Sequence, residues 1–168
     1  MAILAEGSLV NIHGSLDRYV TEYLIDVAGL SVRLHGVRRF VPPTDDPWVE
    51  VHYDFLGLQS AYRRQTGRWA DDALIEATER QGNLQLNIYQ RARLWATRYT
   101  TAAARDLVMA AFPEGKVLQI YGDAGVGEPI GALILDGAQE HVQDQGMQSG
   151  LTQHVIQIRT RYLEHYTR

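Results

Sequence analysis

The residues of this chain that could do chemistry are few and widely spaced. Cysteine is absent, which excludes disulfides, thiolate nucleophiles and thiolate metal sites. No serine lies in a Gly-x-Ser-x-Gly elbow. No two of the six histidines have the short spacing that would place them on one face of a helix or strand, so a metal site would need His52, His141 and His154 to converge across a sheet. We therefore predict no catalytic residue, no metal site and no cofactor.

The glycine-rich segment 122–128 is the nearest approach to a phosphate-binding loop. A P-loop needs Lys and then Ser or Thr after its last Gly, and a dinucleotide-binding run should open a helix. Here Glu128 and Pro129 follow the last Gly, and a strand pattern comes next. An acidic side chain and a Pro without an N–H group both disfavour a bound phosphate. The segment is therefore predicted to be a flexible hairpin or surface loop.

Two pairs of adjacent acids remain as candidates for acid–base chemistry or Mg²⁺ binding. Side chains of adjacent residues point apart, which disfavours a shared site. Asp45 and Asp46 lie among prolines, and Asp71 and Asp72 precede a new element at Ala73. Solvation explains the first pair, and capping of the next element explains the second.

Arginine and aromatic residues gather in the segment 62–69. This mixture binds phosphates and stacks on bases, and it is equally typical of hot spots in protein interfaces. Because the N-terminal half is acidic and no basic stripe continues from the segment, a protein partner is favoured over nucleic acid. The candidate interface residues here and before the central helix are Arg63, Arg64, Arg68, Trp69, Arg91, Arg93 and Trp95.

The net charge of −4 arises entirely from the first half of the chain. Residues 1–84 hold 12 acidic and 8 basic side chains, whereas residues 85–168 hold 8 of each. No broad nucleic-acid surface is therefore expected. All basic residues except Lys116 are Arg, which suits planar contacts with carboxylates at subunit interfaces, although genomic base composition is the simpler explanation. No apolar run approaches the ~20 residues of a membrane-spanning helix.

The elements that position these residues follow from hydrophobic periodicity. Helical spacing from Leu16 to Val27 predicts a helix that Ser15 caps and Gly29 ends. The next segment, 30–41, has room for a short strand before the Pro-rich segment 42–47 stops regular structure.

Alternation predicts strands in the middle of the chain. Val49 to Phe55 has the pattern of a half-buried strand, and 83–90 is the clearest strand, with an outward face that is polar but uncharged. A long loop is expected at about 57–82. Within it, Asp72 to Arg80 fits either a helix or an extended strand.

The C-terminal half continues with one helix and three strands. Thr100 to Phe112 is predicted to be a helix that Pro113 and Gly115 terminate, with Ala104, Leu107, Val108 and Ala111 on its core face. Strands are predicted over 116–121, 130–141 and 151–163, with a hairpin connection at 143–150. The fold class is α+β: a mixed, mainly antiparallel sheet flanked by an N-terminal helix and one central helix, in a single domain of residues 1–168.

Several of these segments resemble the tail terminator proteins of long-tailed bacteriophages. The similarity lies in the strand at 82–89, the helix end at 110–115, the strand at 117–118 and the closing strand at 155–162. The N-terminal helix and the strand at 48–55 fit the same order. The resemblance touches most of the chain and consists of element order and short patterns.

The resemblance implies a structural protein of the virion and not an enzyme. It implies a homo-oligomeric ring, expected to be hexameric, that assembles in the host cytoplasm. The ring would end tail-tube polymerisation, with the tube protein on one face and the head connector or neck protein on the other. DNA would pass through the lumen without specific binding, and no membrane would be involved.

Two other classes remain open. Another neck or head-completion protein would bind the portal or adaptor in place of the tube. A small ligand-binding domain or enzyme would reveal itself by a ligand that raises the melting temperature.

Overall fold

A single eight-stranded sheet organises the described part of the chain. The computed structural model describes residues 2–3, 9–55, 68–70, 73–91, 96–144 and 150–167. In these residues the strand order is β2-β3-β5-β8-β7-β6, with β1 paired to β8 and β4 paired to β5. The strands are β1 (Ala2–Ile3), β2 (Ser31–Arg33), β3 (Trp48–Asp54), β4 (Arg68–Ala70), β5 (Ala73–Arg91), β6 (Val117–Tyr121), β7 (Pro129–Asp144) and β8 (Leu151–Thr167).

The pairing is antiparallel except between β2 and β3, which are parallel. The helices are α1 (Leu9–Val20), its wider π-helical continuation η2 (Thr21–Val27), α2 (Ala96–Ala111) and the single turn α3 (Gly122–Gly125). The predicted α+β class, with a mainly antiparallel sheet, an N-terminal helix and a central helix, is confirmed. None of the helices in the described residues has the length and apolar character needed to cross a bilayer.

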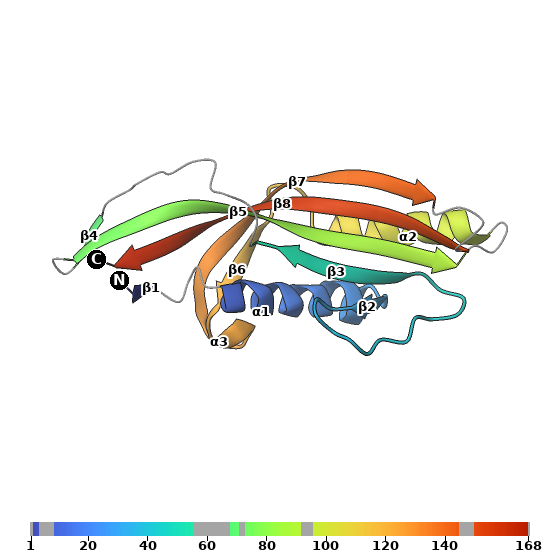
Figure 1. Cartoon of the computed structure of the whole chain (residues 1–168), viewed down its shortest axis with the longest axis horizontal. Coiled ribbons are helices and arrows are strands. Elements are labelled where there is room, and N and C mark those ends of the chain that lie inside the picture. Colours follow the sequence, from blue (N-terminus) through green and yellow to red (C-terminus); the bar gives the residue numbers. More distant parts are fainter. Residues whose placement is uncertain are drawn as a thin grey trace.

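Two strands run the full length of the sheet. β5 and β8 pair continuously from Ile75 and Thr167 to Arg91 and Leu151, whereas β3 pairs only with 83–89 of β5. Figure 1 shows the far ends of β5 and β8 reaching beyond the other long strands, toward β4 and both chain termini. The expected long loop at about 57–82 is therefore wrong in extent, because β4 (Arg68–Ala70) and the first ten residues of β5 lie within it. The segment that fitted either a helix or a strand belongs to β5 from Ala73 onward.

The N-terminal helix lies against both edges of the sheet. α1 contacts β6, and η2 contacts β2, so the sheet curves around the helix (Figure 1). The helix ends at Gly29 as predicted: Gly29 has a φ of 67°, and its N–H donates to the Ile25 carbonyl at 3.0 Å.

The predicted start of this helix is wrong. The helix already includes Leu9, and Ser15 lies inside it. The Ser15 hydroxyl donates to the Asn11 carbonyl at 2.6 Å and accepts the Tyr121 N–H at 2.8 Å. A serine can bond the carbonyl four residues before it without leaving the helix, and here its free lone pair fastens β6.

The central helix is confirmed, and its buried face is narrower than predicted. Ala104 and Val108 are buried, but Leu107 is 42% exposed, so its assignment to the core face is wrong. Thr101 and Phe112 complete the buried stripe instead. The Thr100 and Thr101 hydroxyls donate to Gln90 Oε1 at 2.6 and 2.8 Å, which ties the start of α2 to β5.

The apolar core lies between the sheet and the helices. It combines one face of α1 and α2 with the inward residues of every long strand. Its largest fully buried side chains are Phe112, Ile12, Leu16, Leu24, Leu84, Leu86, Ile88, Leu118, Ile120, Leu133, Leu135 and Ile156.

Candidate interface on the polar face of the sheet

Most residues predicted to form an interface lie outside the described part of the chain. This is so for Arg63, Arg64, Arg93 and Trp95. Arg68 and Trp69 belong to β4, whose backbone pairs with β5 opposite Ile75 and Leu74; their side chains are not described. Arg91 is exposed at the end of β5. The structure therefore does not test whether these seven residues form one surface.

The described residues do contain a continuous polar surface, on the face of the sheet opposite the core. Strand alternation places Asn83, Gln85 and Asn87 of β5 on this face, as predicted. The register then sets Gln157 of β8 beside Gln85 and Gln139 of β7 beside Gln157. Three strands thus contribute amide side chains at one level of the sheet.

These amides bond to one another. Gln157 Nε2 donates to Gln85 Oε1 at 3.0 Å, and Gln85 Nε2 donates to Asn87 Oδ1 at 2.9 Å. Nearby, Gln153 Nε2 donates to the Tyr89 hydroxyl at 3.1 Å. Asn87 is only 4% exposed. These hydrogen bonds order the amide side chains within the chain itself.

One end of this polar face is aromatic. The Trp48 and Tyr89 rings stack with centroids 5.6 Å apart. Glu50 accepts the Trp48 indole N–H at 3.3 Å and pairs with Arg33 at 3.4 Å. Burial, followed by the charge of Glu50, raises the pKa of the Tyr89 hydroxyl, which stays protonated as a hydrogen-bond donor.

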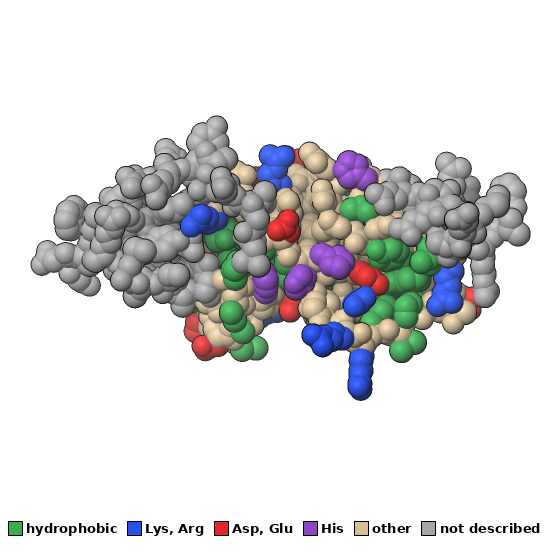
Figure 2. Space-filling model, viewed as in Figure 1, with side chains coloured by type: hydrophobic (Ala, Val, Ile, Leu, Met, Phe, Trp, Pro, Cys, Tyr) green, Lys and Arg blue, Asp and Glu red, His purple; other side chains and the backbone are tan. Residues whose placement is uncertain are grey.

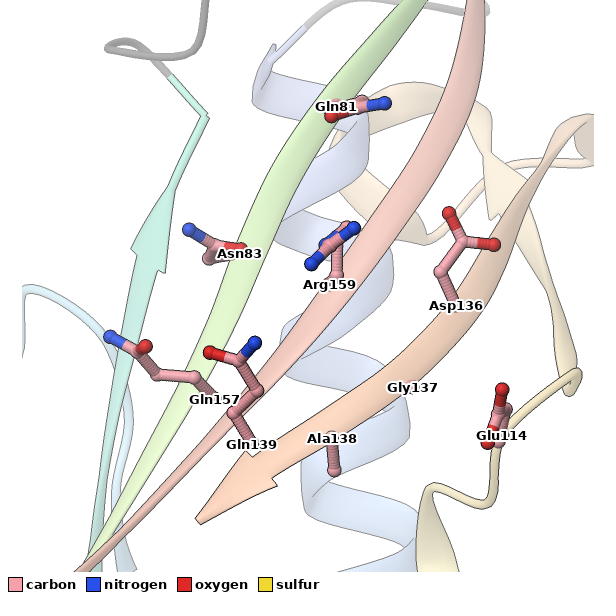
Figure 3. A pocket seen from close by; sticks show the side chains of 9 residues that line it. All are labelled: Gln81, Asn83, Glu114, Asp136, Gly137, Ala138, Gln139, Gln157 and Arg159. Atoms are coloured by element: carbon pink, nitrogen blue, oxygen red, sulfur yellow. The ribbon is translucent and has the colours of Figure 1, made fainter. Parts of the chain in front are cut away.

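The polar face is hollowed where β7 bulges. The pairing of β7 with β8 shifts between Leu135 and Gly137, and Gly137 has a φ of 131°. A side chain at Gly137 would lie 3.5 Å from the Glu114 carboxyl carbon. The hollow has a volume of about 570 Å³ and is lined by Gln81, Asn83, Glu114, Asp136, Gly137, Ala138, Gln139, Gln157 and Arg159 (Figure 3).

Polar and charged side chains line most of this hollow. Figure 3 shows Arg159 on β8 standing between Asn83 on β5 and Asp136 on β7. Asp136 accepts a hydrogen bond from Arg161 Nε, so its charge is already matched. The lining offers amide donors and acceptors, the Arg159 guanidinium and the carboxylates of Glu114 and Asp136. These groups can bond to both the donors and the acceptors of a protein backbone.

The histidines do not form the arrangement that a metal site would need. His52 lies near His35, with ring centroids 6.3 Å apart, whereas His154 Nε2 lies 2.9 Å from Glu140 Oε2. No group of three or more metal-ligating side chains occurs among the described residues. Among the described residues, the convergence of His52, His141 and His154 that a metal site would have required is not observed.

A different histidine cluster lies between α1 and β3, and Figure 2 shows histidine side chains near the middle of the visible surface. His13 and His35 rings are 5.5 Å apart, and His35 Nδ1 accepts the Tyr53 N–H at 3.1 Å. The Tyr53 hydroxyl donates to Asp17 Oδ1 at 2.6 Å, and burial and this carboxylate raise the Tyr53 pKa. Burial lowers the pKa of His13, whose Nε2 is buried without a hydrogen bond in the described structure.

The glycine-rich segment after β6 connects β6 to β7, as the hairpin prediction required. It is not a free surface loop, because it packs closely on α1. The Ala124 N–H donates to Asn11 Oδ1 at 3.1 Å, and a side chain at Gly14 would lie 1.8 Å from the Ala124 carbonyl oxygen. Asp123 and Ala124 have φ values of 48° and 55°. This close packing explains Gly14 and Gly125, since a side chain at Gly125 would lie 2.3 Å from the Gly14 carbonyl carbon.

Comparison with known proteins adds little beyond the fold. No protein-family model matches the chain, and no curated protein matches it. One solved structure, whose name states no function, is similar with a TM-score of 0.50 and 14% identity, over 94% of this chain and 96% of the other. This likeness concerns the fold alone.

A second solved structure is the PVC sheath/tube terminator of an extracellular contractile injection system in the extended state. Its TM-score is 0.37 at 12% identity, over 93% of this chain and 57% of the other, so the chain spans a little over half of that protein. This similarity is too distant to bear on function.

Proposed function

We propose that this chain is a structural tail protein of the terminator type. It forms a ring that ends tail-tube polymerisation and joins the tail to the head connector. The order of elements carries the proposal: helix, strand β3, long strand β5, helix α2, strand β6 and hairpin β7–β8 follow one another as the sequence resemblance to tail terminators requires.

The polar face supports the same proposal. Its central residues are amides bonded to one another, so the face is stable in water and needs little reordering to meet a neighbour. Gln85, Asn87, Gln139 and Gln157 are uncharged and attract phosphates only weakly, so this row of amides can also line a lumen without retaining DNA. Both roles suit a ring protein.

The solution mass of the purified protein tests the proposal. We expect light scattering over a range of concentrations, with negative-stain images, to show a closed ring, alone or on the tail tube. Added to polymerising tube protein of the same phage, the chain should stop growth and remain at the tube end. A monomer that never associates with the tube would overturn the proposal, and association with portal or adaptor alone would move it to another neck protein.

The predicted interface segment allows a second test. Replacing Arg63, Arg64 and Trp69 together with Ala is expected to impair ring formation or capping, because Arg and Trp are the residues that most often anchor interfaces. Arg105→Ala, which removes an arginine that pairs with Glu140 and Asp106 on the surface of α2, is the control for loss of a surface arginine elsewhere in the chain. Unchanged assembly of the triple variant would remove the segment from the interface.

A further inference from the structure

An exposed segment between β2 and β3 combines two arginines with apolar residues. Its sequence over 37–41 is Val-Arg-Arg-Phe-Val. Val41 is 90% exposed and Val37 is 39% exposed, and both arginines are exposed. Among the described residues neither Arg38 nor Arg39 has a hydrogen-bond or ion-pair partner. Large apolar side chains beside unpaired arginines mark a contact surface.

Two hydrogen bonds hold the first residue of the segment, Val37, in place. Arg33 Nε donates to the Val37 carbonyl at 2.8 Å, and the Val37 N–H donates to the Leu34 carbonyl at 3.2 Å. Figure 2 shows basic side chains projecting from the lower edge of the molecule, where Figure 1 places this loop.

A surface of opposite charge lies between α1 and α3. It is a groove of about 580 Å³ that carries three carboxylates on the helix side, Asp17, Glu22 and Asp26. Val126 at its rim is 84% exposed, and Val27 beyond Asp26 is 78% exposed. The groove thus offers acidic and apolar groups, as the segment 37–41 offers basic and apolar ones.

Two of these carboxylates, Glu22 and Asp26, are available for contact with another chain. Asp17 already accepts a hydrogen bond from the Tyr53 hydroxyl. The one cation in the groove, Arg18, is also occupied: its guanidinium lies 4.0 Å from the Tyr121 ring centre, and Nη1 donates to the Gly125 carbonyl at 3.4 Å. Glu22 and Asp26 are exposed and have no hydrogen-bond or ion-pair partner in the described structure.

The groove is preformed. Gly14 and Gly125 bring the two backbones so close that a side chain at Gly125 would lie 2.3 Å from the Gly14 carbonyl carbon. The bond from Ala124 to Asn11 fixes the same contact. A rigid groove loses little entropy when it is filled.

We propose that segment 37–41 of one copy of this chain docks in the α1–α3 groove of a second copy. Arg38 and Arg39 then face Glu22 and Asp26, and the exposed valines of the two surfaces pack together. Figure 1 shows α3 at one end of the α1–η2 helix and the loop at the other. Glu22 and Asp26 lie on η2, toward the end that carries the loop, and in the described residues of one copy neither forms an ion pair with Arg38 or Arg39. The proposal rests on the ring assembly proposed above, since contacts between two different surfaces can continue from copy to copy until a ring closes.

Charge reversal in two variants tests the pairing. R38E/R39E gives a copy with an acidic segment and an acidic groove, and E22K/D26K gives a copy with a basic segment and a basic groove. Each variant alone should associate at least about tenfold more weakly than the parent, because like charges then meet at every contact. An equimolar mixture should recover the parent mass, because each segment again meets a groove of opposite charge.

Sedimentation velocity at equal total concentration measures these masses. D106K, which reverses an exposed acid on α2, is the control and should behave as the parent does. Thermal unfolding checks each fold; if a double variant unfolds early, R39E and D26K are mixed instead. A parent that stays monomeric, a variant that associates like the parent, or a mixture that does not recover would overturn the pairing.

A tube-capping assay on the same variants separates this pairing from the proposed function. If the parent caps the tube and charge reversal leaves association unchanged, the pairing is wrong and the ring is built by other surfaces. If the mixture recovers association but the parent never stops tube growth, the pairing holds and tail termination is wrong.

Discussion

The two faces of the sheet are made from the same strands and have opposite properties. On β5, Leu84, Leu86 and Ile88 are fully buried, while the intervening Asn83 and Gln85 remain partly exposed on the polar face. A single alternating stretch therefore builds the core with every second residue and a hydrogen-bonded polar surface with the others. Under the proposed function, stability and association depend on alternate positions, so each can be altered separately.

The faces also differ in how their groups are satisfied. The inner face excludes water with close-packed apolar side chains. A cavity left there by a truncated side chain is therefore not filled by water. On the outer face Gln157, Gln85 and Asn87 bond in sequence, and each primary amide retains hydrogen-bonding capacity. Water or a partner can bond to the amide donors and acceptors that remain.

Truncation on the inner face gives the largest effect. We expect Leu86→Ala to lower the free energy of unfolding by about 2–5 kcal/mol, because it removes buried contacts and leaves a cavity. Urea unfolding measures the loss. Gln85→Ala, one residue away on the other face, is the control, and an equal loss from it would contradict the distinction between the faces.

Adding a side chain on the inner face should give the next largest loss of stability. In Gly82→Ala the new methyl group would lie 1.9 Å from Phe55 Cδ1, so the buried ring must shift, at about 1–3 kcal/mol. Gly122→Ala serves as the comparison, since its nearest neighbour would be 3.7 Å away. Similar melting temperatures for the two variants would show that Phe55 moves freely.

Truncation on the outer face should leave the fold nearly unchanged. Gln157→Ala removes the donor to Gln85, and water replaces it, so we expect a loss of less than about 1 kcal/mol. Gln139→Ala, on the neighbouring strand, is the matched variant. A large drop in the urea midpoint for Gln157→Ala alone would mean that the amide row holds the sheet together.

The smallest effect on stability is expected from a change of pH, which alters the protonation of His13, a polar side chain near the core. Burial lowers the pKa of His13 from 6.5, and the nearby His35 lowers it further. The unfolded chain then binds a proton more readily than the folded one, so this contribution to stability is complete above pH 6.5 and is lost as the pH falls toward the lowered value. Melting temperatures between pH 7.5 and 5 should fall less steeply for His13→Gln than for the exposed control His141→Gln.

Much of the fold could be predicted from periodicity, because alternation and helical spacing report burial directly. Strands β3 and β6, most of β7 and β8, the central helix and the second half of β5 with its polar face were accessible in this way. The first half of β5 was not, because residues 73–82 lack clear alternation and were expected to belong to a long loop. The start of α1 was missed because Asn11 and Gly14 are poor helix formers, and their reason for being there is the contact with α3. That contact joins segments too distant in sequence to be recognised from local patterns.

The rest of the polar surface could not be predicted, because it depends on the register in which the strands pair. Only pairing across β5, β8 and β7 sets Gln85, Gln157 and Gln139 side by side. The β7 bulge had a local signal in the Asp136–Gly137 dipeptide, since Gly within a strand pattern often marks a bulge. Leu107 was misassigned because helical spacing does not reveal how wide a stripe the partner covers.

The fastening of α1 to β6 has a consequence for synthesis of the chain. The Gln119 N–H donates to the Tyr19 hydroxyl and the Tyr121 N–H to Ser15, across 100 and 106 residues. At about 5–20 residues per second, roughly 5–20 s pass between the emergence of the helix from the ribosome and that of the strand that receives it. During that interval the apolar side of the helix, with Ile12 and Leu16, is open to chaperones and to neighbouring nascent chains.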